Sequence, residues 1–94
     1  MNKQEAQSLV EETLAVSKGE GNLISCMIIP EETIEKPWGW VFYYQSKEYV
    51  ETRDFRHMLA GNAPIIVNRI TGELWHTGTA FDIEHYIKEY EAKL

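Results

Sequence analysis

The fold depends on one stretch of sequence, Pro37-Trp38-Gly39-Trp40-Val41-Phe42-Tyr43-Tyr44-Gln45. Aromatic and β-branched residues dominate it after Pro37, which is typical of a β-strand. Side chains alternate between the two faces of a strand, so Trp38, Trp40, Phe42 and Tyr44 should share one face. We expect this strand to be central and its large aromatic side chains to face the core.

The segments on either side of this strand predict two helices and three more strands. Apolar residues at helical spacing predict a helix over residues 3–17, with Asn2 and Glu5 as a capping pair. A short apolar run at 23–29, closed by Pro30, predicts a strand. Residues 65–77 read as a hairpin with Gly72 in its turn, and residues 79–94 as a closing helix. Thr79 and Asp82 have capping-box spacing at the start of that helix.

This order of elements predicts an α+β protein. We expect a four-stranded antiparallel sheet flanked by an N-terminal and a C-terminal helix, in the order α-β-β-β-β-α, with the helices packed on one face. No repeat or linker divides the 94 residues, so residues 1–94 should form a single domain.

Two alternatives remain for the hairpin. Pairing Asn68 with Glu73 would place Ile65, Val67, Leu74 and His76 on one face, and Ile66 and Trp75 on the other. If the second set is core, Trp75 is ordinary packing. If the first set is core, an exposed apolar patch remains, which would suit a partner or a second copy of the chain. That candidate protein-binding patch consists of Val41, Tyr43, Ile66 and Trp75.

The segment from 46 to 63 is mixed in character. Tyr49 and Val50 could extend strand pairing, and residues 55–59 could form a helical turn. A small charged cluster of Arg53, Arg56 and His57 lies here. It reads either as a solvated loop or as a second set of candidate protein-binding residues, because binding residues concentrate on loops held by a scaffold.

Charge and composition limit the classes of partner. Nine Lys and Arg against fifteen Asp and Glu give a net charge of −6, which argues against binding nucleic acid. The acidity either serves solubility or complements a basic partner. No run of residues is apolar enough for a membrane span, and the N-terminus does not resemble a secretory signal, so we expect a cytoplasmic protein.

A search for catalytic chemistry finds no constellation, so we expect no enzymatic activity, no cofactor and no metal site. Cys26 is the only cysteine and sits in an apolar run, where an inert thiol is the ordinary state. His57, His76 and His85 are scattered and show no metal-binding spacing. No glycine-rich phosphate loop occurs.

Several segments, in this order, resemble the YrhB-like family, also called immunity protein 35. They are Trp40-Val41-Phe42-Tyr43-Tyr44, Tyr49-Val50-Glu51-Thr52, Ala60-Gly61-Asn62-Ala63-Pro64-Ile65-Ile66-Val67-Asn68, Thr71-Gly72-Glu73, Thr77-Gly78-Thr79-Ala80 and Tyr86-Ile87-Lys88-Glu89-Tyr90-Glu91. The resemblance covers about residues 38–91, and its order and spacing carry the specificity.

The resemblance implies a small bacterial cytoplasmic protein without enzymatic activity that protects its producer by binding a cognate toxin. An alternative is a chaperone-like or regulatory protein-binding module that is not paired with a toxin. Such a module would use the exposed aromatic sheet face described above. A small hydrolase using Cys26 or a histidine is the least favoured hypothesis. The sequence identifies neither the target protein nor the surface that contacts it.

Overall fold

The computed structural model describes residues 1–17, 26–58 and 63–94. Its strands pair antiparallel in a four-stranded sheet, β2-β3-β5-β6, and a two-stranded sheet, β1-β4. The elements are α1 (Lys3–Ser17), β1 (Cys26–Ile28), η1 (Pro30–Glu32), β2 (Ile34–Lys36), β3 (Gly39–Phe42), β4 (Tyr44–Ser46), α2 (Lys47–Thr52), η2 (Phe55–His57), β5 (Ile65–Asn68), β6 (Leu74–His76) and α3 (Ile83–Ala92). The predicted α+β class is confirmed, with antiparallel strands and a helix near each end of the chain.

Helix α1 begins where the sequence predicts. The side chain of Asn2 accepts a hydrogen bond from the Glu5 backbone N–H (2.8 Å), and the Glu5 carboxylate accepts one from the Asn2 N–H (3.0 Å). This reciprocal pair satisfies two backbone donors that the helix cannot satisfy itself. Ala6 and Val10, one turn apart, are completely buried. Gly19 and Gly21, which follow the helix in the sequence, lie outside the described residues.

The predicted long strand is divided at Tyr43 into β3 and β4, which belong to different sheets. Trp40, Phe42 and Tyr44 lie in one hydrophobic cluster, as alternation predicts. The prediction for Trp38 is wrong, since it packs with the opposite cluster and its ring lies 4.8 Å from that of Tyr90. Trp38 precedes β3, so the alternation of the strand does not govern it.

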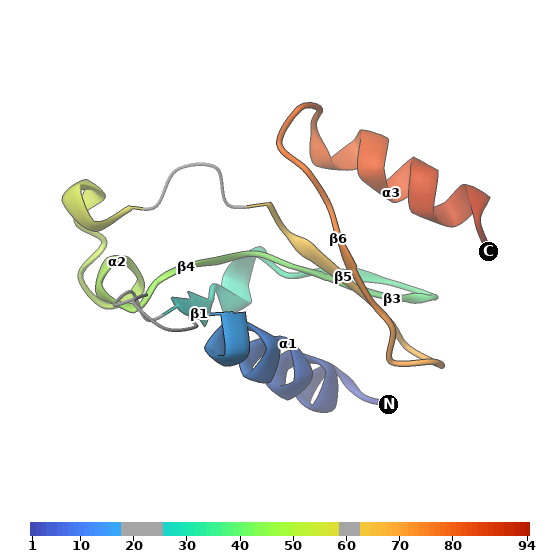
Figure 1. Cartoon of the computed structure of the whole chain (residues 1–94), viewed down its shortest axis with the longest axis horizontal. Helices are drawn as coiled ribbons and strands as arrows, with labels where there is room; N and C mark the ends of the chain where they lie inside the picture. Colours follow the sequence, from blue (N-terminus) through green and yellow to red (C-terminus); the bar gives the residue numbers. More distant parts are fainter. Residues whose placement is uncertain (18–25, 59–62) are drawn as a thin grey trace.

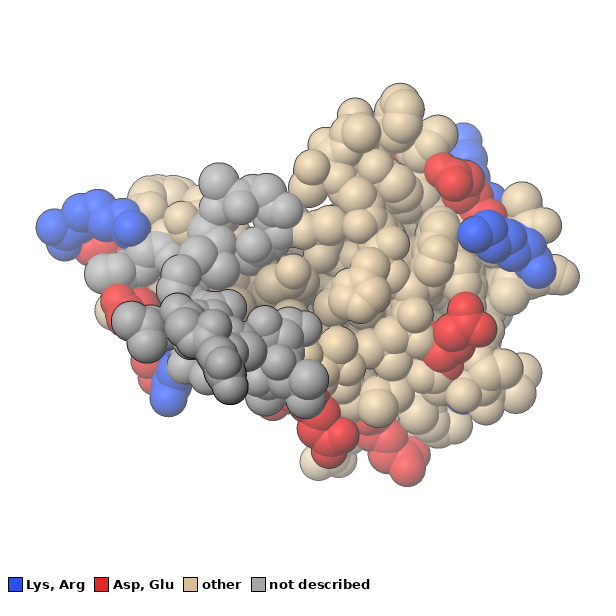
Figure 2. Space-filling model, viewed as in Figure 1, with Lys and Arg blue, Asp and Glu red and all other residues tan. Residues whose placement is uncertain are grey.

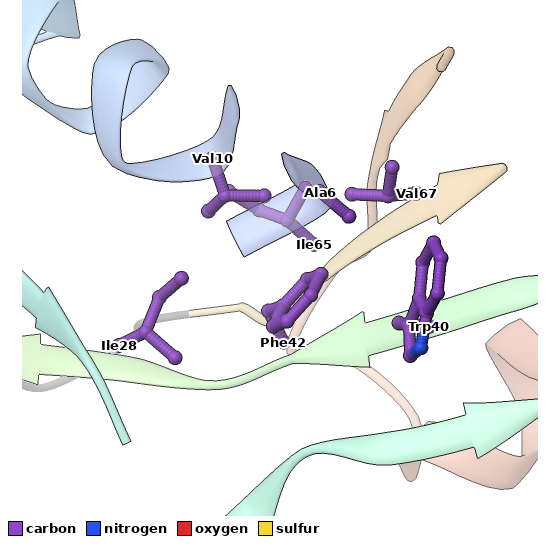
Figure 3. Close-up of a cluster of buried hydrophobic side chains, with 7 residues drawn as sticks. All are labelled: Ala6, Val10, Ile28, Trp40, Phe42, Ile65 and Val67. Atoms are coloured by element: carbon purple, nitrogen blue, oxygen red, sulfur yellow. The ribbon is translucent and has the colours of Figure 1, made fainter. Parts of the chain in front are cut away.

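The two terminal helices cover opposite faces of the sheet (Figure 1). Below α1 lies the first cluster, formed by Ala6, Val10, Ile28, Trp40, Phe42, Ile65 and Val67 (Figure 3). Beneath α3 lies the second, formed by Val41, Ile66, Ile87 and Tyr90 with half-buried Ile34, Trp38, Tyr43, Trp75 and Ile83 around it. The expectation that both helices pack on one face is therefore wrong, because both faces of β3 and β5 are apolar and each needs a cover.

The hairpin formed by β5 and β6 has the predicted register. Asn68 donates its backbone N–H to the Glu73 carbonyl (2.9 Å), and Ile66 is opposite Trp75. Gly72 has the left-handed backbone that the turn requires, with φ of +72°. Ile65, Val67 and Leu74 lie on one face of the hairpin and Ile66 and Trp75 on the other, as predicted. Both faces contribute to a hydrophobic cluster, so neither of the two alternatives for the core face is sufficient by itself.

Several local predictions need correction. Asp82, rather than Thr79, caps α3, and its carboxylate accepts the His85 backbone N–H at 3.2 Å. Strand β2 lies within the acidic segment 31–36, for which a loop would be expected. Of the predicted strand at 23–29, the structure shows β1, and residues 23–25 lie outside the described residues. The expected helical turn appears as η2, while Leu59 and the turn at 61–62 lie outside the described part of the chain.

The role of α3 as a cover can be tested with two isoleucines. Ile87 is 2% exposed beneath α3, whereas Ile70 in the hairpin turn is 90% exposed. Ile87→Ala should lower the free energy of unfolding by about 2–5 kcal/mol, because it leaves a cavity in the second cluster. Ile70→Ala, the matched control, should change it by less than about 0.5 kcal/mol. Urea unfolding measures both, and equal effects would contradict the arrangement.

Gly39 should tolerate no side chain. A Cβ at this position would lie 1.9 Å from the carbonyl oxygen of Val67 on the neighbouring strand, and backbone cannot move aside cheaply. Gly39→Ala should therefore destabilise the protein by about 3 kcal/mol or more. In the comparison variant, Gly78→Ala, the Cβ meets the Tyr86 side chain, with the hydroxyl oxygen 2.6 Å away, and a side chain moves aside more easily than backbone, so the loss of unfolding free energy should be smaller.

Candidate functional site

The sheet-face residues predicted to bind a partner are largely inaccessible. Val41 and Ile66 are completely buried beneath α3. Trp75 is half-buried, with its ring 5.3 Å from that of Tyr90 and the Lys93 ammonium 4.6 Å from its centre. The interpretation of a bare sheet face is therefore wrong, because the closing helix occupies it.

The second predicted set lies at the far end of the molecule from the hairpin turn, around α2 and η2 (Figure 1). The Arg53 and Arg56 side chains are 50% and 86% exposed. Each is held by a carboxylate, Arg53 by Glu31 and Arg56 by Asp54, the latter at 2.6 Å. Figure 2 shows basic and acidic side chains side by side at this end. His57 belongs to η2, and its side chain lies outside the described part of the structure.

Local capping interactions build this end of the chain. Ser46 caps α2 by accepting the Tyr49 backbone N–H at 3.1 Å, which ends the strand and starts the helix. Arg53 ends α2 in the left-handed conformation (φ 58°, ψ 25°), so the chain reverses there. Asp54 then caps η2 by accepting the Arg56 N–H at 3.0 Å. These turns set the course of the backbone from which the exposed side chains project.

We define the α2 surface as Tyr49, Arg53, Phe55, Arg56 and Met58. Phe55 is 76% exposed and Met58 49% exposed. The Tyr49 ring lies 6.0 Å from that of Phe55 and 5.9 Å from the Arg53 guanidinium. Aromatic residues, Met and Arg are the residues enriched at the centres of protein interfaces. The composition of this surface is therefore that of a protein-binding site.

A pocket of about 220 Å³ opens beside the α2 surface. It is lined by Ile29, Glu32, Tyr43, Tyr44, Gln45, Tyr49, Arg53 and Met58. The Ile29 backbone N–H donates to the Tyr43 carbonyl (2.9 Å), which fixes η1 against the junction of β3 and β4. The pocket, which we call the Tyr43 pocket, brings together Tyr43 and Arg53 from the two predicted sets.

Two groups near the Tyr43 pocket, the Tyr43 phenol and the Glu31 carboxylate, have shifted pKa values. Burial raises the pKa of the Tyr43 phenol, and the carboxylates of Glu32 and Glu84 raise it further by opposing a second negative charge. The pKa of Glu31 is lowered, because its carboxylate accepts a backbone hydrogen bond and one from the Arg53 guanidinium. Glu84 comes from the first turn of α3, so carboxylates from two separate segments act on the Tyr43 phenol.

The sequence pointed to Tyr43 and Arg53 but missed their neighbours. Ser46 is a preferred N-cap residue, and it caps α2, where the sequence offered Tyr49 and Val50 as a possible extension of strand pairing. That strand expectation is wrong. The roles of Glu32 and Glu84 carry no local signal, since they meet Tyr43 only in the folded chain.

Among the described residues, no three His, Cys, Asp or Glu side chains are placed to hold a metal ion. Cys26 is a free, half-buried thiol in β1. Within the same residues, no helix is both long and apolar enough to cross a membrane. The candidate site is an open surface with a small adjoining pocket on a small α+β protein.

The model of the family described as Immunity protein 35 matches residues 4–92. The chain belongs to this family, as the resemblance in its strands and turns indicated, and the match extends that resemblance into the first 37 residues.

One curated relative is "Uncharacterized protein YrhB" of Escherichia coli (strain K12), with 44% identity over 55 residues. The alignment spans 58% of this chain and 58% of the length of the relative. No solved structure matches the chain.

The raised pKa of Tyr43 predicts a pH effect on stability. Because the pKa of Tyr43 is higher in the folded state than in the unfolded state, its contribution to the free energy of unfolding is fully present below the unfolded pKa, near 10. This contribution is lost as the pH rises through the folded pKa. Tyr43→Phe should weaken this alkaline loss of stability, as measured by urea unfolding.

Glu32→Gln should lower the pKa of Tyr43, measured by phenolate absorbance with Tyr43→Phe as reference. An unchanged phenolate titration in Glu32→Gln would show that Glu32 does not act on Tyr43.

Proposed function

We propose that this protein is an immunity protein that binds a cognate bacterial toxin and neutralises it in the cytoplasm of the producing cell. Membership of the immunity protein 35 family, over residues 4–92, is the observation that carries this proposal. Neutralisation would be stoichiometric, through a tight complex, and would involve no reaction catalysed by this chain.

The α2 surface is the contact region that we propose for the toxin. The Met58 backbone N–H donates to the Phe55 carbonyl at 3.1 Å, so both exposed apolar side chains come from one short turn. Arg53 and Arg56 lie beside these side chains with their guanidinium groups oriented by carboxylates. A central apolar patch with charged neighbours is the usual arrangement of a protein interface.

The chaperone-like form of the alternative receives no support from the sheet face. It required an apolar face open to partly unfolded clients, and Val41 and Ile66 on that face are completely buried. Phe55 and Met58 are flanked by paired charges, which favours a specific partner.

Two phenylalanines provide the test. The product of the neighbouring gene, expressed as the toxin, should stop growth, and co-expression of this chain should restore it. Phe55→Ala should weaken the complex by about 2 kcal/mol or more and reduce the rescue, because Phe55 would be buried by the partner. Phe81→Ala removes another ring, 60% exposed in the loop between β6 and α3 and outside the α2 surface, and should leave both the affinity and the rescue unchanged.

Growth rescue and the dissociation constant of the purified complex measure the two effects. Failure of the wild-type chain to bind or to rescue would remove the proposed function. Binding that tolerates Phe55→Ala but not Phe81→Ala would keep the function and move the contact surface toward α3.

A further inference from the structure

Arg53 is the only residue other than glycine with a positive φ in the described part of the chain. Its backbone (φ 58°, ψ 25°) ends α2 in the left-handed region, and its N–H donates to the Tyr49 carbonyl at 2.6 Å. A residue with a Cβ is disfavoured in this region, and helices that end in this way usually have Gly or Asn at the position. Glycine would therefore be the more stable residue here.

The contacts of the Arg53 side chain within the chain offset little of this disadvantage. Its guanidinium donates to the Glu31 carboxylate, but the two side chains are 50% and 56% exposed. Ion pairs open to solvent contribute little to stability, because water screens the charges and both side chains lose conformational freedom. The guanidinium lies 5.9 Å from the centre of the Tyr49 ring, near the outer limit of a favourable cation–π contact. Folding alone thus gives no reason for an arginine at position 53.

These same contacts orient the guanidinium at the surface without burying it. Glu31, from η1, takes one of the five N–H donors of the planar group. The Tyr49 ring beside it also contacts the ring of the exposed Phe55, at 6.0 Å. An arginine oriented in advance by a carboxylate and a ring loses less conformational freedom when a partner binds. The guanidinium fork suits oxygen acceptors of that partner, either a carboxylate or a backbone carbonyl.

We propose that Arg53 is the residue of the α2 surface that binds an acceptor oxygen of the toxin, and that its presence at this helix end lowers the stability of the free protein. The proposal rests on the proposed function and identifies one contact within it. Backbone strain that folding does not require is characteristic of functional sites. Replacement of Arg53 by glycine should therefore weaken binding without weakening the fold, as in other cases where function and stability conflict.

The test compares two variants at position 53. The toxin is the purified product of the neighbouring gene, carrying an inactivating substitution; calorimetry measures the Kd and urea unfolding measures stability. Arg53→Gly should raise the Kd by about tenfold or more, because the acceptor of the toxin loses its donor. Its urea midpoint should equal or exceed that of the wild-type chain. Arg53→Ala should raise the Kd to the same extent, but its midpoint should lie below that of Arg53→Gly, since alanine is strained in the left-handed region.

Lys88→Ala is the matched control for charge. Lys88 is exposed on α3, outside the α2 surface, and its loss changes the net charge as much as the loss of Arg53 does. The Kd of this variant should stay close to the wild-type value.

Once Arg53→Gly has weakened binding, replacing each surface Asp and Glu of the toxin by Asn or Gln identifies the acceptor. A toxin residue whose effect disappears in Arg53→Gly marks a carboxylate, as a double-mutant cycle reports. The absence of such a residue marks a backbone carbonyl. Near-UV circular dichroism checks that each variant keeps its fold.

The outcomes separate the two proposals. If the toxin binds the wild-type chain and both variants at position 53 alike, the Arg53 contact is wrong while the immunity function stands. An equal weakening by Lys88→Ala would mean that only net charge matters, and this also overturns the contact. A urea midpoint for Arg53→Gly below that of the wild-type chain would mean that the arginine serves the fold, which contradicts the proposal. If the wild-type chain does not bind at all, both proposals fail.

Discussion

Strand β3 is buried on both faces, and the rest of the structure depends on this. Residues Gly39 to Phe42 are all buried, with Trp40 and Phe42 beneath α1 and Val41 beneath α3. On one side β3 pairs closely with β5, where the missing side chain of Gly39 admits the Val67 carbonyl. A strand with two apolar faces needs a layer on each side. The two terminal helices supply these layers, which fixes the three-layer arrangement.

This double cover decides where a partner can bind. With both faces of the sheet used for the core, little apolar sheet surface remains for recognition. The exposed apolar side chains of the α2 surface instead lie beyond the sheet, where Ser46 and Asp54 cap two short helices and Arg53 reverses the chain. A rigid core carrying short capped turns is a common way to present binding residues.

The roles of individual acidic residues are also apparent only in the folded chain. In the sequence, Glu31 and Glu32 are two of many acidic residues, and solubility explains them. In the structure, Glu31 pairs with Arg53, while Glu32 acts on Tyr43 together with Glu84 from a helix more than fifty positions away. Acidity that looks uniform in composition thus includes one carboxylate held in an ion pair and two that act on a phenol.

The sequence by itself determined the elements whose signals are local: the Asn2–Glu5 cap of α1, the hairpin register through Asn68 and Glu73, and the left-handed turn at Gly72. These depend on residues three to five positions apart, and strand alternation likewise identified the shared faces of Trp40, Phe42 and Tyr44. Alternation cannot say which helix covers which face, because both faces here are apolar. Only tertiary structure decided that α3 buries Val41 and Ile66, and that residues near 30, 43, 49 and 53 line one pocket.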